Sequence, residues 1–158
     1  MNWLPSRFLQ SSVGILYMFA AVAPFSSMTA DFAHYVTIQG EDIQEGQLVS
    51  LAKDHYELST KEYDGELTGV IVAKPPVAIN TVGHDSTYPI ADSANALVLV
   101  SASNGPLEVG DPITSSDQRG IAIKATRPGM IVGRTLEAFN PSDSTETKLI
   151  NTTLLFKW

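Results

Sequence analysis

Apolar and polar residues alternate over short distances along this chain, and the alternation breaks every few residues. Beyond residue 30, no stretch of ten or more residues has helical periodicity. β-Branched and aromatic residues instead gather in short runs bounded by glycine, proline and polar residues, which is typical of strands. The pattern predicts strands at residues 34–39, 48–52, 55–59, 70–73, 96–101, 121–125, 130–132 and 152–158. The predicted fold class is therefore all-β, a small β-clip or barrel preceded by an N-terminal hydrophobic helix.

Polar residues and prolines mark the predicted breaks between these strands. Lys53-Asp54 separates two strands in the manner of a hairpin. Pro75-Pro76 predicts an edge, a bulge or a crossing between sheets, because two successive prolines cannot donate ladder hydrogen bonds. The sequence further predicts an exposed loop at 80–89, a compact polar turn at 115–120 and a polar linker at 140–147.

The chain also repeats itself. Three glycines recur 64 residues later (110 − 46, 129 − 65 and 133 − 69), with apolar residues on both sides of each. Glycines at fixed offsets indicate turns and strand ends that the backbone makes twice in the same way. We therefore predict a duplicated strand unit at about 43–72 and 107–136, whose structural turns use Gly46, Gly65, Gly69, Gly110, Asp111, Pro112, Gly129 and Gly133.

The segment 8–25 is apolar apart from three polar residues, and it follows a start that carries only Arg7 as a charged side chain. Three interpretations stay open: a cleaved signal peptide, a retained membrane anchor, or a buried core helix. The best cleavage site ends at Ala30, although Met28 is larger than such a site prefers. Acids from Asp31 onward favour an outside domain. We therefore expect residues 1–30 to be a signal or anchor and 31–158 an exported β-domain, extracellular or membrane-anchored.

Composition narrows the classes of function. The 158 residues carry a formal net charge of −7 and include no cysteine. Disulfides, thiolate metal sites and thiol nucleophiles are thereby excluded. An acidic chain without a basic stripe also argues against nucleic-acid partners. At 44% hydrophobic residues, the composition is that of a globular domain.

The second repeat resembles a known module. Residues 104–116 read Asn-Gly-Pro-Leu-Glu-Val-Gly-Asp-Pro-Ile-Thr-Ser-Ser, and 120–125 and 128–133 follow as Gly-Ile-Ala-Ile-Lys-Ala and Pro-Gly-Met-Ile-Val-Gly. This pattern resembles a β-clip-like module near the C-termini of phage tail and neck appendages and related bacterial surface proteins. In some relatives the module looks like an intramolecular-chaperone autoprotease domain. The resemblance implies a backbone shape and a surface-structural context. Self-cleavage is not carried over, because an export segment stands where those relatives have a long fibrous region.

Candidate chemistry is sparse. Ser115, Ser116 and Lys124 can be written as a serine–lysine catalytic arrangement. Turn chemistry is the favoured interpretation of the same residues, because serine next to aspartate and glycine hydrogen-bonds nearby backbone. At Asp111-Pro112 a ligand-binding role stands beside the favoured one, a carboxylate that caps a turn stiffened by proline. No catalytic residue is therefore assigned in the leading interpretation.

No metal or cofactor is expected. The three histidines His34, His55 and His84 lack metal-ligand spacing from one another. The acidic cluster Glu41, Asp42 and Glu45 lacks the alternating oxygen ligands and central glycine of a calcium loop. The favoured interpretation of both sets is a structural or solvated one.

Partners are expected to be copies of this chain or another surface protein, with a membrane as a further contact if 8–25 stays attached. The end of the chain supplies the candidate binding residues Leu154, Leu155, Phe156 and Trp158, which either close the barrel or extend a neighbouring sheet. The leading function is a non-enzymatic structural or assembly module. The alternatives are the autoproteolytic chaperone and a carbohydrate-binding module that uses Tyr56, Tyr63, Tyr88 and Trp158. Asn151-Thr-Thr153 also matches a glycosylation acceptor.

Overall fold

The computed structural model describes residues 33–73, 78–79 and 87–158, and the described residues form eleven strands and no helix. The prediction of an all-β fold with a closed barrel is thereby confirmed. Within these ranges no helix is long and apolar enough to cross a membrane. The predictions for the apolar segment 8–25 and for Pro75-Pro76 concern residues outside the described ones.

The C-terminal half of the chain closes into a barrel, which we call ring 2. Its strand order is β10-β11-β7-β9-β8, and β8 also pairs with β10. The parallel pair is β7 with β9, and the other neighbours are antiparallel. The strands are β7 (Asn95–Ser101), β8 (Pro112–Ser115), β9 (Ala122–Lys124), β10 (Ile131–Thr135) and β11 (Thr147–Lys157).

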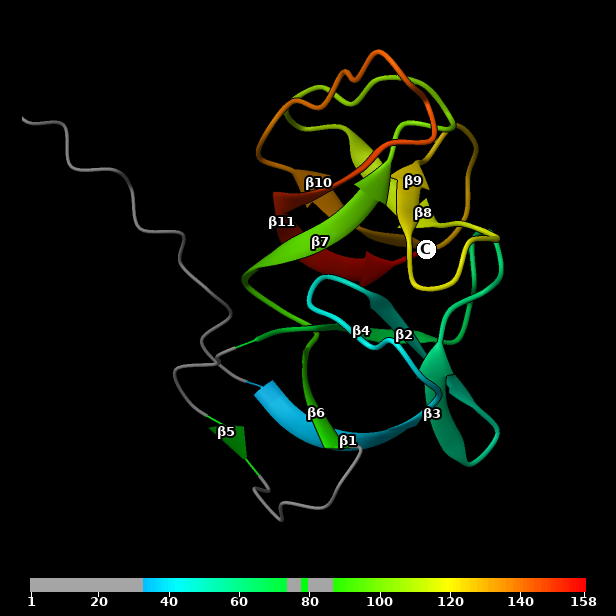
Figure 1. Ribbon diagram of the computed structural model, residues 1–158, viewed down its shortest axis with the longest axis vertical. Coiled ribbons are helices and arrows are strands. Elements are labelled where there is room, and N and C mark those ends of the chain that lie inside the picture. The colour runs from blue at the N-terminus through cyan, green and yellow to red at the C-terminus, as the bar shows by residue number, and fades with distance from the viewer. Residues whose placement is uncertain (1–32, 74–77, 80–86) are drawn as a thin grey trace, which may run out of the picture.

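The N-terminal half forms a second cycle of strands, which we call ring 1. The order is β3-β2-β4-β6-β1, and β1 returns to pair in parallel with β3, while the short strand β5 pairs with β1. The strands are β1 (Ala33–Gln39), β2 (Leu48–Ala52), β3 (His55–Leu58), β4 (Leu67–Ile71), β5 (Ala78–Ile79) and β6 (Thr87–Ala91). Figure 1 shows the two rings one above the other.

The two rings share one pairing scheme, with β1, β2, β3, β4 and β6 in the places of β7, β8, β9, β10 and β11. Hydrogen bonds correspond as well. The Gly46 N–H donates to the carbonyl of Ile71 over 2.8 Å, and the Gly110 N–H donates to that of Thr135 over the same distance. Both glycines have positive φ, 85° and 90°, a conformation that a side chain makes costly. Each therefore makes the same turn into its ring's second strand.

A second pair of glycines lets strands approach closely. A Cβ on Gly69 in β4 would lie 3.0 Å from the carbonyl oxygen of Ala91 in β6. A Cβ on Gly133 in β10 would overlap the carbonyl oxygen of Thr153 in β11. Gly133 also lies at the irregular register of the β10–β11 ladder, where a side chain would push the strands apart, whereas the irregular register beside Gly69 is in the ladder of β4 with β2.

The apolar core lies in two clusters. One draws on five strands of ring 1 and fills that ring: Val36, Ile38, Val49, Leu58, Ile71 and Ile90. The other joins both rings, because Leu48, Val70 and Val72 of ring 1 belong to the same cluster as Val98, Val132 and Ile150 of ring 2. Ring 1 thus packs an apolar outer face against ring 2, which explains why Val70 and Ile71 are both buried.

Two predicted breaks are corrected by the structure. The loop predicted at 80–89 is wrong at its end, because Thr87–Ala91 form β6. Pro89 is tolerated there because its carbonyl accepts a hydrogen bond from Val72 N–H, over 3.0 Å, and proline keeps that acceptor. Residues 80–86 of that prediction lie outside the described residues.

The predicted turn at 115–120 is also wrong at its start. Ser115 ends β8 and is fully buried, and Ser116 is only 2% exposed. The final strand is longer than predicted, since β11 begins at Thr147. It pairs with both β7 and β10 and so closes ring 2.

Candidate functional site

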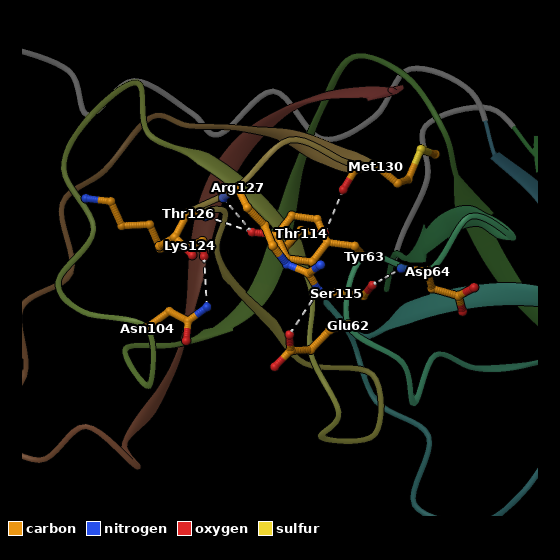
Figure 2. A network of polar contacts seen from close by, with 10 residues as sticks. All are labelled: Glu62, Tyr63, Asp64, Asn104, Thr114, Ser115, Lys124, Thr126, Arg127 and Met130. Atoms are coloured by element: carbon orange, nitrogen blue, oxygen red, sulfur yellow. Dashed lines mark hydrogen bonds and ion pairs between the residues drawn. The ribbon is translucent and has the colours of Figure 1, made fainter.

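A buried carboxylate stands where the two rings meet. Asp64 is 7% exposed and accepts hydrogen bonds from the hydroxyls of Ser50, over 2.7 Å, and Ser59, over 3.1 Å. Its other oxygen accepts the backbone N–H of Glu66 over 3.1 Å. The Asp64 N–H in turn donates to Ser115 Oγ of ring 2 over 2.9 Å, as Figure 2 shows. The carboxylate therefore orders a ring-1 loop whose backbone binds ring 2.

Tyr63, which precedes Asp64 in the same loop, forms a second link between the rings. Its phenol oxygen accepts the backbone N–H groups of Thr126, over 2.8 Å, and Arg127, over 3.0 Å. The Arg127 guanidinium lies 4.2 Å from the ring centroid (Figure 2). Desolvation of the phenol raises its pKa, but hydrogen bonding to Thr126 and Arg127 and the charge of Arg127 outweigh it, so the pKa of Tyr63 is lowered.

Asp111 caps the turn before β8. Its carboxylate accepts the Glu108 N–H over 2.8 Å and pairs with Lys124 Nζ at 2.6 Å. The Lys124 hydrogen bond, the Glu108 hydrogen bond and the charges of Lys124 and Arg134 lower the pKa of Asp111. In ring 1 the Gln47 side chain caps the matching turn, since its Oε1 accepts the Gln44 N–H over 2.9 Å. The contacts are those of a turn cap.

The hydrogen bonds of the described residues do not assemble the serine–lysine arrangement. Ser115 Oγ receives the Asp64 N–H, and Ser116 Oγ donates to the carbonyl of Ile121 over 2.7 Å. Lys124 Nζ is engaged by Asp111 and by the carbonyl of Pro106. Both contacts place the Lys124 amine at the Asp111 turn, and no hydrogen bond of the described residues joins it to either serine hydroxyl.

The candidate metal ligands are not brought together either. In the part of the chain that the structure describes, no group of three histidine, aspartate or glutamate residues could hold a metal ion. His55 has Asp54 at 3.4 Å and Glu57 at 3.6 Å as its neighbours. Asp42 lies in a turn at positive φ, and His84 lies outside the described residues.

The four candidate binding residues, three in β11 and Trp158 directly after it, divide between core and surface. Leu154 is 4% exposed and belongs to the core, and Phe156 packs against it. Leu155 is 39% exposed and Trp158 is 81% exposed. The indole of Trp158 lies over Gly65, where a Cβ would come within 2.9 Å of it. Of the four, Leu155 and Trp158 are therefore the ones whose exposed apolar surface a partner could contact.

The aromatic residues of the carbohydrate hypothesis play separate roles. Tyr56 and Tyr88 pack against the interior cluster of ring 1. Tyr63 is held between Arg127 and Gly129, where a Cβ would lie 2.6 Å from its ring. Asn151 of the glycosylation pattern hydrogen-bonds through Nδ2 to Glu137.

A groove of about 520 Å³ in ring 1 was missed by sequence reasoning. It lies between β1 and β3, and its walls are Tyr35, Val36 and Thr37 on one side and Asp54, His55 and Tyr56 on the other. Asp64 was missed as well, because its serine partners are not adjacent in sequence. The duplication relates this place to one in ring 2, but the sequence does not show that a groove is open there.

Comparisons with known proteins gave a likeness in structure alone. No family model and no curated protein matches the chain. The crystal structure of a C-terminal fragment of bacteriophage phi29 gene product 12 superposes with a TM-score of 0.53 and 14% sequence identity, covering 78% of this chain and 99% of that one. At this identity the match establishes a shared fold. The chain thus has the all-β fold found in a fragment of a phage protein.

Proposed function

We propose that this chain is a non-enzymatic structural and assembly module of a phage-type appendage or a related surface structure. The observation that carries the proposal is the two-ring fold, which extends over 99% of the phage gene product 12 fragment. The motifs at 104–116, 120–125 and 128–133, which resemble those of appendage proteins, support the same context.

The module consists, in this proposal, of two copies of one strand unit. Equal pairing schemes, the matched bonds of Gly46 and Gly110, and the matched close approaches of Gly69 and Gly133 support a duplication. A chain that stacks one unit on another by an apolar face and by polar links is a rigid platform, which suits a structural role.

Assembly uses the outer side of β11, with Leu155 and Trp158, and the loop at 140–146. Sedimentation velocity of the full chain over a range of concentrations tests this. We expect oligomers that the double variant Leu155→Glu, Trp158→Glu weakens and that the control Lys61→Glu on ring 1 leaves unchanged. A wild-type chain that stays monomeric throughout would refute assembly with itself through this surface.

Autoproteolysis is the minority alternative. Ser115, Ser116 and Lys124 are engaged in structural hydrogen bonds, which supports the non-enzymatic assignment. Intact-mass measurement decides between the two: one species, differing from the full chain at most by removal of an N-terminal signal, is expected. Internal fragments that disappear in Ser115→Ala or Ser116→Ala would establish cleavage instead.

Export completes the proposal, with residues 1–30 as signal or anchor and the β-domain outside. The N-terminal residue of the native protein tests it. A mature chain beginning near residue 31, or an intact chain found in the membrane fraction, supports export, and an intact chain in the cytoplasmic fraction overturns it.

A further inference from the structure

Ring 1 docks onto ring 2 by inserting a glycine segment beside β7. The Leu99 N–H in β7 donates to the carbonyl of Gly46 over 2.8 Å, and the Leu48 N–H donates to the carbonyl of Gly120 over 2.9 Å. A Cβ on Gly46 would overlap Leu149 Cδ2 and would lie 2.8 Å from Leu99 N. Glycine is thus required at this position, followed two residues later by the buried leucine.

The segment fits because two parallel strands of ring 2 separate there. β7 and β9 pair at Val100 and Ala122, and this is their one pair among the described residues, so β9 does not cover the backbone edge of β7 upstream of Val100. Leu99 immediately precedes Val100, and Gly120 stands two residues before Ala122. These two positions supply the donor and the acceptor that hold the inserted segment.

Ring 1 has the same opening. β1 and β3 pair in parallel from Ile38, opposite Tyr56, and β5 pairs with β1 only as far as His34. Among the residues that the structure describes, the stretch 35–37 therefore has no strand on this edge. Thr37 immediately precedes Ile38, and Asp54 stands two residues before Tyr56. They correspond in position to Leu99 and Gly120, and both line the 520 Å³ groove.

The matching ring-2 turn of a second copy, which contains Gly110, is poorly suited to occupy this groove. The carbonyl of Gly110, which corresponds to that of Gly46, already accepts a hydrogen bond from Arg134 Nη1 over 2.7 Å. Pro112, which corresponds to Leu48, has no N–H to donate. Of the two backbone groups that ring 1 uses for docking, ring 2 therefore has one already engaged and lacks the other.

We propose that the groove between β1 and β3 is a docking site for a peptide segment of another protein, in which a glycine is followed two residues later by an aliphatic residue. The glycine carbonyl accepts the Thr37 N–H, as Gly46 accepts that of Leu99, and main-chain bonding of this kind is a common mode of peptide recognition. The inference rests on the assembly function proposed above. It can fail while that function holds, because the assembly surface lies on ring 2.

A synthetic peptide of residues 43–50, capped at both ends, is a direct probe, because this segment fills the equivalent opening in ring 2. It is titrated into the isotope-labelled chain and followed by amide chemical shifts. We expect saturable shifts at Thr37 and at Asp54–Tyr56, with binding about tenfold weaker when valine replaces the peptide's glycine. No saturable shift at millimolar peptide, or equal binding of the valine peptide, would overturn the proposal.

Variants of the chain give a second test of the docking proposal. Thr37→Pro removes the donor and should weaken peptide binding about tenfold, whereas the control Thr37→Val keeps the N–H and should bind as the wild type does. Circular dichroism checks that Thr37→Pro is folded, and if it is not, the valine peptide decides alone. Val109 is 67% exposed and immediately precedes Gly110, in the ring-2 turn that matches the docking turn of ring 1. Self-association that Val109→Glu abolishes and Leu155→Glu does not would assign the groove to a second copy and refute a separate partner.

Discussion

Replacement of Asp64 by alanine should destabilise the whole fold, because this carboxylate is the acceptor on which a buried network converges. The hydroxyls of Ser50 and Ser59 are 3% and 2% exposed as residues, and both donate to Asp64 Oδ2. Without an acceptor, each buried hydroxyl costs about 1–3 kcal/mol. Release of the carboxylate from a desolvated site offsets part of that cost. We expect the free energy of unfolding to fall by about 2–4 kcal/mol.

Urea denaturation followed by circular dichroism measures this change, with the slope against urea as a check that the same surface unfolds. Asp64→Asn is the matched variant, because the amide keeps the shape and one acceptor oxygen, and it should cost about 1 kcal/mol. In the double variant with Ser50→Ala the two losses should not add, because the residues share one hydrogen bond. An Asp64→Ala chain within about 0.5 kcal/mol of wild type, the range of an ordinary surface substitution, would refute the reasoning.

Three further predictions concern the two close-approach glycines, Asp111 and Tyr63. Gly133→Ala should cost about 3 kcal/mol by urea denaturation, because its Cβ meets a backbone oxygen, whereas Gly69→Ala should cost about 1 kcal/mol; equal losses would contradict the difference in approach. The lowered pKa of Asp111 means that its ion pair with Lys124 stabilises the fold above about pH 3.8 and is lost as pH falls through the lowered pKa. Asp111→Asn should therefore lose less stability than wild type between pH 5 and pH 2, and parallel pH curves would contradict this. Tyr63→Phe should cost less than about 1 kcal/mol by thermal melting, because the two amides that it leaves are exposed; a loss above about 2 kcal/mol would contradict that reasoning.

Local signals in the sequence predicted much of the fold. The Lys53-Asp54 hairpin is present, with Lys53 at positive φ, since a two-residue loop between strand-forming runs leaves little choice of geometry. The run at 96–101 is a strand, and Gly46 and Gly110 make turns that other residues would strain. These features depend on neighbours in sequence, which is why the pattern indicates them.

Contacts between distant segments could not be predicted in the same way. Ser115 has the sequence surroundings of a turn, but the Asp64 N–H, 51 residues away, makes it a buried acceptor. Pro89 has the surroundings of a loop, but a strand that needs only its carbonyl accommodates it. The groove beside Thr37 follows from where two parallel strands separate, which no local pattern encodes. Tertiary hydrogen bonding overrides local preference in each case.

The order of strands along the chain also bears on how the protein folds during synthesis. Ring 1 uses residues up to Ala91, so it can close while the ribosome is still producing ring 2. Its outer face with Leu48, Val70 and Val72 then stays uncovered until β11, the last strand to emerge, completes ring 2. We therefore expect the nascent chain to expose this apolar face for a time set by the rate of translation. A chaperone that binds apolar surface would bind the chain during that time.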